Sequence, residues 1–163
     1  LIEESDMLAT SLKPLPLKQN STWQQNEIDE FLKTHNEPMR LAFNDGSPFP
    51  RICSVWYHYS AKSKQIIAVS HKNAFINKSL KKDPHVGFEI GTNAPPYQGI
   101  RGQAKITAIQ SLGKEYLPIL MQKYLGDDYA QLQHWLMRRA DQEEALVLDI
   151  EWITAWDYSL RMH

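Results

Sequence analysis

The segment PRICSVWYHYSAKSKQIIAVSHKNAFINKSLKKDP occupies residues 50–84 and decides how the chain folds. Its apolar residues predict two strands, Arg51–Tyr59 and Gln65–Ser70, with a polar turn at 60–64 between them. A short helix is then expected at Ala74–Lys82, because Ile76 and Leu80 share one helical face and Asp83-Pro84 ends it. The segment therefore reads as a hairpin that leads into a helix.

The junction between this hairpin and its helix has the composition of an anion site. Ser70, His71, Lys72 and Asn73 precede the helix start, where backbone N–H groups lack partners and the helix dipole is positive. Lys78 adds positive charge on the same helix. Such a corner favours a phosphate. A plainer reading stays open, in which Asn73 only caps the helix and the lysines only face solvent.

Composition bounds the remaining possibilities. With 163 residues, 42% of them hydrophobic, the chain is long enough for one domain with a substantial core. We expect an extended arm at residues 1–20, where prolines oppose a helix, and a single domain at residues 21–163. The net charge of −1 gives no general attraction to nucleic acid or to an anionic membrane. No apolar run is long enough to span a membrane, and Cys53 is the single cysteine, so a cytoplasmic protein is expected.

The rest of the chain is expected to contain three further helices and four further strands. The first helix is expected to begin at Ser21, which forms a capping-box pattern with Gln24. Two helices are expected near residues 117–126 and 128–139. The second would be capped by Asp127 or Asp128 and would bury Leu132, Trp135 and Leu136. The remaining predicted strands are Met39–Phe43, Val86–Ile90, Ile100–Ile109 and Ala145–Trp156. Six strands without a βαβ rhythm predict a mainly β (α+β) fold, an antiparallel barrel with flanking helices.

Five segments in this order resemble the pyridoxamine 5'-phosphate oxidase-like, FMN-binding split-barrel family. They are PRICSVWYHY (50–59), IIAVSHKNAF (66–75), LKKDPHVGFEI (80–90), GIRGQAKIT (99–107) and WDYSLRM (156–162). The likeness covers residues 36–162. It implies a six-stranded Greek-key split barrel, a bound FMN and a homodimer whose two chains share the cofactor sites.

The resemblance also assigns residues to the cofactor. Arg51 matches a strand arginine that contacts the flavin phosphate or ring edge, and the next three residues match the strand whose backbone runs along the ring. Ile76 stands where many relatives carry a basic residue, so Lys72 and Lys78 are the substitutes. Gln98, Trp156 and Arg161 match residues that reach the flavin of the partner subunit. The full set of expected cofactor-binding residues is Arg51, Ile52, Cys53, Ser54, Ser70, Lys72, Asn73, Lys78, Gln98, Trp156 and Arg161.

Candidate walls for a flavin ring are Trp56, Tyr97 and Trp156. The six histidines show no pair at helical spacing, and no Walker loop, Gly-x-Ser-x-Gly or GxGxxG occurs, so metal, nucleotide and serine-hydrolase chemistry is unsupported. No residue pattern names a catalytic acid or base.

The sequence thus predicts an FMN-dependent oxidoreductase that acts on a small molecule. It is not expected to be a true pyridoxamine-phosphate oxidase, because those enzymes keep a basic C-terminal tail and this chain ends SLRMH. The alternative is a non-catalytic protein that binds flavin, deazaflavin or haem on the same fold.

Overall fold

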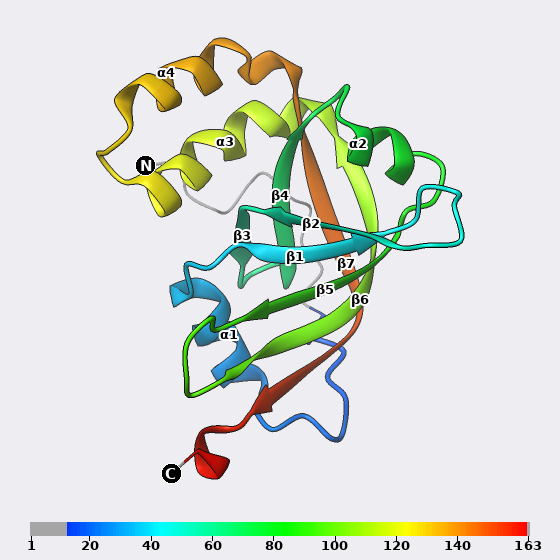
Figure 1. Ribbon diagram of the computed structural model, residues 1–163, viewed down its shortest axis with the longest axis vertical. Coiled ribbons are helices and arrows are strands. Elements are labelled where there is room, and N and C mark those ends of the chain that lie inside the picture. The colour runs from blue at the N-terminus through cyan, green and yellow to red at the C-terminus, as the bar shows by residue number, and fades with distance from the viewer. Residues whose placement is uncertain (1–12, 163) are drawn as a thin grey trace.

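The computed structural model describes residues 13–162, which form one seven-stranded sheet with helices around it (Figure 1). The sheet order is β2-β1-β5-β6-β7-β4-β3, and every neighbouring pair is antiparallel. The strands are β1 (Met39–Phe43), β2 (Arg51–Val55), β3 (Tyr57–Ser60), β4 (Gln65–His71), β5 (His85–Gly91), β6 (Gln98–Ile109) and β7 (Glu143–Asp157). The predicted antiparallel split barrel with flanking helices is confirmed.

The sheet rolls into a barrel at Trp56. Its two edge strands, β2 and β3, are consecutive in the chain and only Trp56 separates them, so the two edges of the sheet meet at this residue. The prediction of one continuous strand at Arg51–Tyr59, and hence of six strands, was wrong. The first half of this segment pairs with β1 and the second with β4, and one strand could not keep a straight ladder with both.

Two side chains of a helix supply the hydrogen bonds that the backbone of Tyr57 would otherwise make within the sheet. Tyr124 Oη accepts a hydrogen bond from the backbone N–H of Tyr57 at 3.3 Å, and Lys123 Nζ donates to the Tyr57 carbonyl at 3.0 Å. The Trp56 ring stacks on Tyr124, with 5.2 Å between centroids. Both backbone polar groups of Tyr57 are therefore paired although the ladder stops there.

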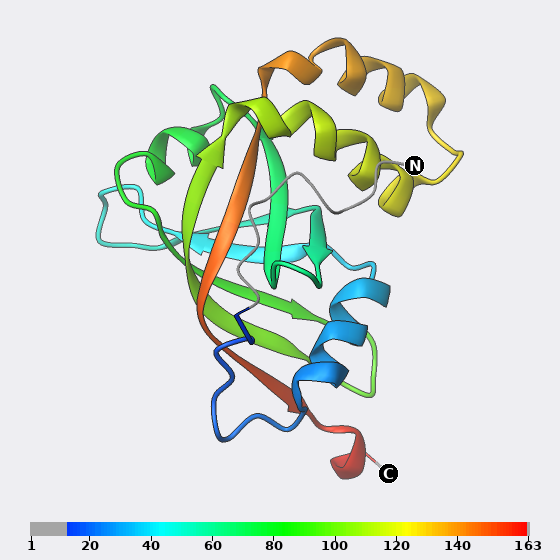
Figure 2. The same ribbon diagram turned by 180° about the vertical axis from the view of Figure 1, so that it is seen from behind.

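The helices lie at two places around the barrel. They are α1 (Gln25–Thr34), α2 (Phe75–Leu80), α3 (Gln110–Leu125) and α4 (Ala130–Arg138), with short 3-10 turns η1 (Ala140–Gln142) and η2 (Ser159–Arg161). Figures 1 and 2 show α2, α3 and α4 at one end of the barrel and the C-terminus at the other, with α1 against the lower part of the barrel.

Alternation along the strands fills the barrel. Met39, Leu41 and Phe43 of β1 are buried, as are Val86, Phe88 and Ile90 of β5. Ile28 and Leu32 of α1 join the same core, as the predicted apolar stripe requires. Full burial of each such apolar side chain contributes about 1.5–3 kcal/mol. The alternate residues of these strands face outward, and they form the site described below.

Two helix starts differ from their predictions. α1 begins four residues after Ser21, because the Ser21 hydroxyl accepts a bond from the Ala155 N–H of β7, while Gln24 N–H donates to Glu27 Oε2 at 2.8 Å. α4 begins after Tyr129, whose φ is +60°, so neither Asp127 nor Asp128 caps it.

The predicted buried face of α4 was also wrong. Leu132 and Trp135 are 41% and 46% exposed, and α4 contains no buried residue. Leu136 alone of the three packs inward, against Leu117 and Met121 of α3. Helix α3 begins at Gln110, well before the period that starts at Leu117, and contains Pro118 in its interior.

Part of the predicted N-terminal arm is described. Pro16 and Lys18 bond to the backbone of Ile153 on β7, and Leu15 is buried. Residues 1–12 of that arm lie outside the described residues. Within residues 13–162, no helix combines the length and the apolar character that a membrane crossing requires.

Candidate functional site

A groove crosses the outer face of the barrel over strands β2, β1, β5, β6 and β7. Strand register places Ile52, Ala42, Gly87, Gln103 and Trp152 in one row. Of the three residues between Ile52 and Trp152, Ala42 and Gly87 have almost no side chain, and Gln103 Oε1 accepts a hydrogen bond from Trp152 Nε1 at 2.9 Å, so the floor beside Ile52 is low and flat. This part of the groove encloses about 450 Å³. A flat floor between two apolar walls suits a planar ligand.

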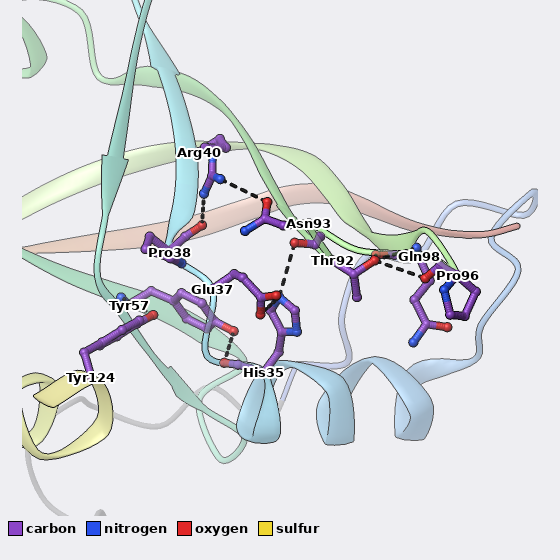
Figure 3. A network of polar contacts seen from close by, with 11 residues as sticks. His35, Glu37, Pro38, Arg40, Tyr57, Thr92, Asn93, Pro96, Gln98 and Tyr124 are labelled. Carbon is purple, nitrogen blue, oxygen red and sulfur yellow. Dashed lines mark hydrogen bonds and ion pairs between the residues drawn. The ribbon is translucent and has the colours of Figure 1, made fainter. Parts of the chain in front are cut away.

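Charged residues form the next row of the outer face. Arg40, Glu89 and Arg101 are register neighbours on β1, β5 and β6, and all three line the groove. Arg40 is fixed by bonds to the Pro38 carbonyl (2.6 Å) and Asn93 Oδ1 (3.3 Å), as Figure 3 shows. This edge of the groove therefore offers two guanidinium groups with one carboxylate between them.

The groove continues past Gln103 toward the beginning of β5. A second hollow of about 310 Å³ shares Ala42, Gly87 and Gln103 with the first. Its far end is formed by His85 and Asn44, among others. The two hollows are thus parts of one elongated groove.

Arg51 lies beside a third hollow, next to this far end. Its Nε donates to Asp45 Oδ2 at 2.7 Å, and its guanidinium lies 5.1 Å from the centroid of the Phe75 ring. Asp45 and Phe75 line a hollow of about 440 Å³ together with Lys78, Lys82 and Asn44. The structure therefore brings Arg51 and Lys78, two predicted phosphate ligands, to the same place.

Asp45 orients Arg51. Hydrogen bonds from Ser47 and from Arg51 hold the pKa of the Asp45 carboxyl well below its usual range, so the carboxylate is charged at neutral pH. Because only Arg51 Nε is used by Asp45, the two terminal amino groups of the guanidinium keep their donors for another acceptor; no bond from them occurs within residues 13–162. A bidentate arginine contact to phosphate uses such donors.

The predicted phosphate corner at residues 70–73 does not line that hollow. Lys72 N–H bonds to the Gln142 carbonyl (2.8 Å), and Asn73 N–H faces His71 Nδ1 (3.1 Å). The N-cap residue of α2 is Ala74, not the expected Asn73. Ser70 lies in the β4 ladder, and its carbonyl faces Asn77 Nδ2 at 3.4 Å. Two backbone donors of this corner are therefore already occupied.

The other residues of the predicted strand divide between the two faces of β2. Ser54 lies opposite Arg40 on the outer face, beside the exposed Ile52. Cys53 pairs with Leu41, packs against the core, and has its thiol pKa raised by burial.

The start of β6, the end of β7 and η2 lie at the opposite, C-terminal end of the barrel (Figure 1). These segments carry Gln98, Trp156 and Arg161, respectively. The Trp156 indole lies over Gly91 and Gly99, since a Cβ added to either glycine would be 3.0 Å from the ring. Trp156 Nε1 is buried and has no hydrogen-bond acceptor within the described residues. A buried donor without a partner is unusual, and its acceptor would have to come from outside the described residues.

A polar network fixes the hairpin that carries Gln98 (Figure 3). Thr92 Oγ1 accepts from Gln98 N–H at 3.1 Å, and His35 Nε2 lies 3.3 Å from the Gly91 carbonyl and 2.9 Å from Glu37 Oε2. Tyr57 Oη donates to the His35 carbonyl at 3.0 Å. Burial lowers the pKa of His35, and the neighbouring Glu37 carboxylate acts in the opposite direction. The hairpin is therefore tied to the barrel seam at Tyr57.

The sequence interpretation missed several residues of the groove and misplaced one wall. Trp56 faces Tyr124 of α3, whereas Trp152, which was not predicted, forms the wall. Arg40 and Gln103 were also missed. The available signal was the strand alternation itself, which places all three on the outer face once β1, β6 and β7 are in register.

Solved structures with the same fold were found by comparison. No protein-family model and no curated protein sequence matches the chain. A conserved hypothetical protein, Rv2991 of Mycobacterium tuberculosis, superposes with a TM-score of 0.73 at 12% identity, covering 90% of this chain and 92% of that one. An F420 reductase gives 0.61 at 12% identity, with 77% and 94% covered.

A third structure is similar in the same way. A candidate pyridoxamine 5'-phosphate oxidase of Listeria innocua gives a TM-score of 0.59 at 12% identity, covering 82% of this chain and 97% of that one. At such identities these likenesses show a shared fold, and function has to be argued from the site.

Proposed function

We propose that this protein binds a flavin-type cofactor, FMN in the first instance, in the outer-face groove and the adjoining Arg51 hollow. The observation that carries the proposal is that the groove and the Arg51 hollow adjoin each other. Asn44 lines both the groove and the hollow that contains Lys78 and Lys82. The hollow is lined by Lys78 and Lys82 and also by Asp45 and Asp83, and Arg51 adds a third cation beside it. A flat apolar space next to these three cations matches a molecule with a planar ring and a phosphate. Two solved structures of this fold, named as an F420 reductase and a candidate pyridoxamine 5'-phosphate oxidase, support the same class of ligand.

Each part of the site has a separate task. Arg51, held by Asp45, and Lys78 would bind the phosphate through charge-assisted hydrogen bonds. Ile52 and Trp152 would flank the ring above the floor of the groove. A bound flavin supplies the two-electron redox chemistry, and the protein supplies position and polarity.

The active form is proposed to be a homodimer. Within one chain, the expected cofactor residues lie at two separate places. Arg51 and Lys78 lie at or near α2, whereas Trp156 and Arg161 lie at the C-terminal end of the barrel. A second copy related by two-fold symmetry could bring one chain's C-terminal end to the other chain's groove. Large exposed apolar side chains support such a contact, since Ile52 is 72% and Leu160 90% exposed.

The proposed activity is an FMN-dependent oxidoreductase reaction on a small molecule, excluding pyridoxamine phosphate oxidation. The F420 reductase likeness favours one alternative, a deazaflavin in the same groove. Titration of the purified protein with FMN, F420 and haem separates the possibilities. Quenching of FMN fluorescence at micromolar concentrations, followed by turnover with a reduced nicotinamide, is the expected result. Binding of F420 or haem alone would overturn the FMN assignment, and bound FMN without turnover would indicate a carrier.

A further inference from the structure

Asp83 and His85 form a hydrogen-bonded pair at the far end of the groove. Asp83 Oδ1 accepts from the His85 backbone N–H at 3.1 Å and lies 2.7 Å from His85 Nδ1. Asn44 Nδ2 donates to the second oxygen, Asp83 Oδ2, at 3.1 Å. Donors from two elements therefore hold this carboxylate, which in turn sets the orientation of the imidazole.

This arrangement leaves one ring nitrogen of His85 for a ligand. A carboxylate against Nδ1 favours the proton on Nδ1, which leaves Nε2 as the second site. No bond from Nε2 is present within residues 13–162, and the side chain is 63% exposed. The hydrogen bonds from His85 and Asn44 lower the pKa of Asp83, so the carboxylate keeps its charge in the neutral range. Carboxylates orient proton-exchanging histidines in this way in enzymes.

His85 belongs to the groove and not only to the surface turn before β5. It lines the 310 Å³ hollow with Asn44, Gln103 and Glu151, and it is the one histidine among the described residues that line either part of the groove. Glu89 lies four residues further along β5, about 13 Å away at the usual rise of a strand. The groove thus has a histidine at one end and the Arg40–Arg101 edge at the other.

The charges around His85 nearly balance. Its cross-strand partner is Lys105, whose Nζ lies 3.5 Å from Glu151 Oε1. Lys105 is also the register partner of Asp149 on β7. On the α2 side, Lys78 and Lys82 line the hollow that Asp83 borders. The nearest charge to the His85 ring is its own partner, the Asp83 carboxylate at 2.7 Å, and the surrounding charges of the two signs nearly offset one another.

We propose that His85 Nε2 is a pH-dependent contact for a small organic acid or carbonyl compound that binds in the groove. The protonated ring donates to the carboxylate or carbonyl oxygen of that ligand, and Asp83 acts as the positioning residue. The proposal rests on the proposed function, since it places the substrate of the cofactor in the same groove, but the His85 contact can be measured without the cofactor.

Benzoate serves as the probe, with protein both free and saturated with FMN. Imidazole ¹⁵N NMR follows His85, and calorimetry measures benzoate affinity at pH 6 and pH 8. The variants are His85→Gln and Asp83→Asn, and His134→Gln on α4 is the matched control. We expect benzoate to shift the His85 ring nitrogens and to bind at least tenfold more tightly at pH 6 than at pH 8. His85→Gln should remove this pH dependence, and Asp83→Asn should change the Nδ1/Nε2 tautomer ratio, while His134→Gln alters neither.

The outcomes distinguish this inference from the cofactor proposal. Benzoate that leaves the His85 nitrogens unmoved, or that binds His85→Gln with wild-type affinity at pH 6, would overturn the inference whether or not FMN binds. Benzoate that moves His85 in a protein unable to bind FMN supports the His85 contact and rejects the cofactor. A folded Asp83→Asn variant with an unchanged tautomer ratio would reject the positioning role of Asp83.

Discussion

Asp45 accepts a single 2.7 Å hydrogen bond from Arg51 Nε, and the terminal amino groups of the guanidinium have no hydrogen-bond acceptor among the described residues. The Asp45 side chain is only 6% exposed, whereas that of Arg51 is 59% exposed. The carboxylate is thus the fixed partner and the arginine the accessible one. This geometry would suit the proposed phosphate contact, and it motivates the first two predictions.

Replacing Arg51 with Ala should weaken FMN binding by about 1.5–3 kcal/mol, the scale of a hydrogen bond to a charged group. The dissociation constant would rise roughly ten- to 150-fold. Fluorescence titration measures this change. Arg138→Ala on the exposed face of α4 is the control and should bind FMN as the wild type does; an equal affinity in Arg51→Ala would return this residue to an ordinary surface charge.

Replacing Asp45 with Asn should make the free energy of unfolding depend less strongly on pH in the acid range. The pKa of Asp45 is lowered in the folded protein, so its contribution is present above the unfolded carboxyl pKa, about 4, and is lost as the pH falls toward the folded value. The stability difference between wild type and Asp45→Asn should therefore be largest near pH 7 and shrink toward pH 2. Urea denaturation at several pH values tests this, and a constant difference would contradict it.

Because of Lys123, the free energy of unfolding should rise as the pH is raised through the alkaline range. Burial lowers the pKa of Lys123 to about 8, whereas an unfolded lysine titrates at about 10.4. The unfolded chain binds more protons between these values, so stability rises with pH from about 8 to about 10.4. Lys123→Met lacks this rise. Thermal unfolding of both proteins from pH 7 to pH 10.5 measures it, and parallel curves would show that Lys123 titrates normally.

Gly99 of β6 and Gly87 of β5 should tolerate alanine differently. A Cβ on Gly99 would lie 2.4 Å from the Ile90 carbonyl oxygen, and backbone cannot move aside cheaply. Gly99→Ala should cost about 1–3 kcal/mol, as overpacked sites do. At Gly87 the nearest atoms to an added Cβ are 3.9 Å away, so Gly87→Ala should stay within about 0.5 kcal/mol. Chemical denaturation compares them; equal stabilities would mean that the hairpin relaxes.

Removing residues 156–163 should loosen the proposed dimer and weaken FMN together. Ligand that contacts both chains stabilises the dimer by linkage, so the two losses are coupled. Sedimentation velocity and FMN titration measure them on the same truncated protein. A truncated chain that stays dimeric with full FMN affinity would exclude a site shared between subunits.

Short-range patterns predicted most of the barrel. Alternation places Met39, Leu41 and Phe43 inside, and the structure has β1 at the predicted residues. Strand ends also agree closely, with β5 at His85–Gly91 against a predicted Val86–Ile90. The apolar period of α4 was read as a buried face, yet Leu132 and Trp135 remain exposed. Period alone reports that one face is apolar, not that another element covers it.

The candidate site was harder to predict because its residues are far apart in sequence. Arg51 and Lys78 were expected at a phosphate, but their common neighbour Asp45 was not, since it belongs to a turn between two strands. The backbone donors at 72 and 73 looked free in sequence and are used by Gln142 and His71. Whether a donor is free depends on contacts that form only in the folded chain.

The sequence by itself determined the antiparallel strands, the two faces of each strand and the hairpin that leads into α2, because side-chain alternation and turn residues act over a few positions. Only the tertiary structure decided that the Arg51–Tyr59 segment bends at Trp56 and closes the barrel, and that Ala42, Gly87 and Gln103 share one groove floor. Register between strands that are distant in the chain comes from the packing of the whole core, and no local pattern encodes it.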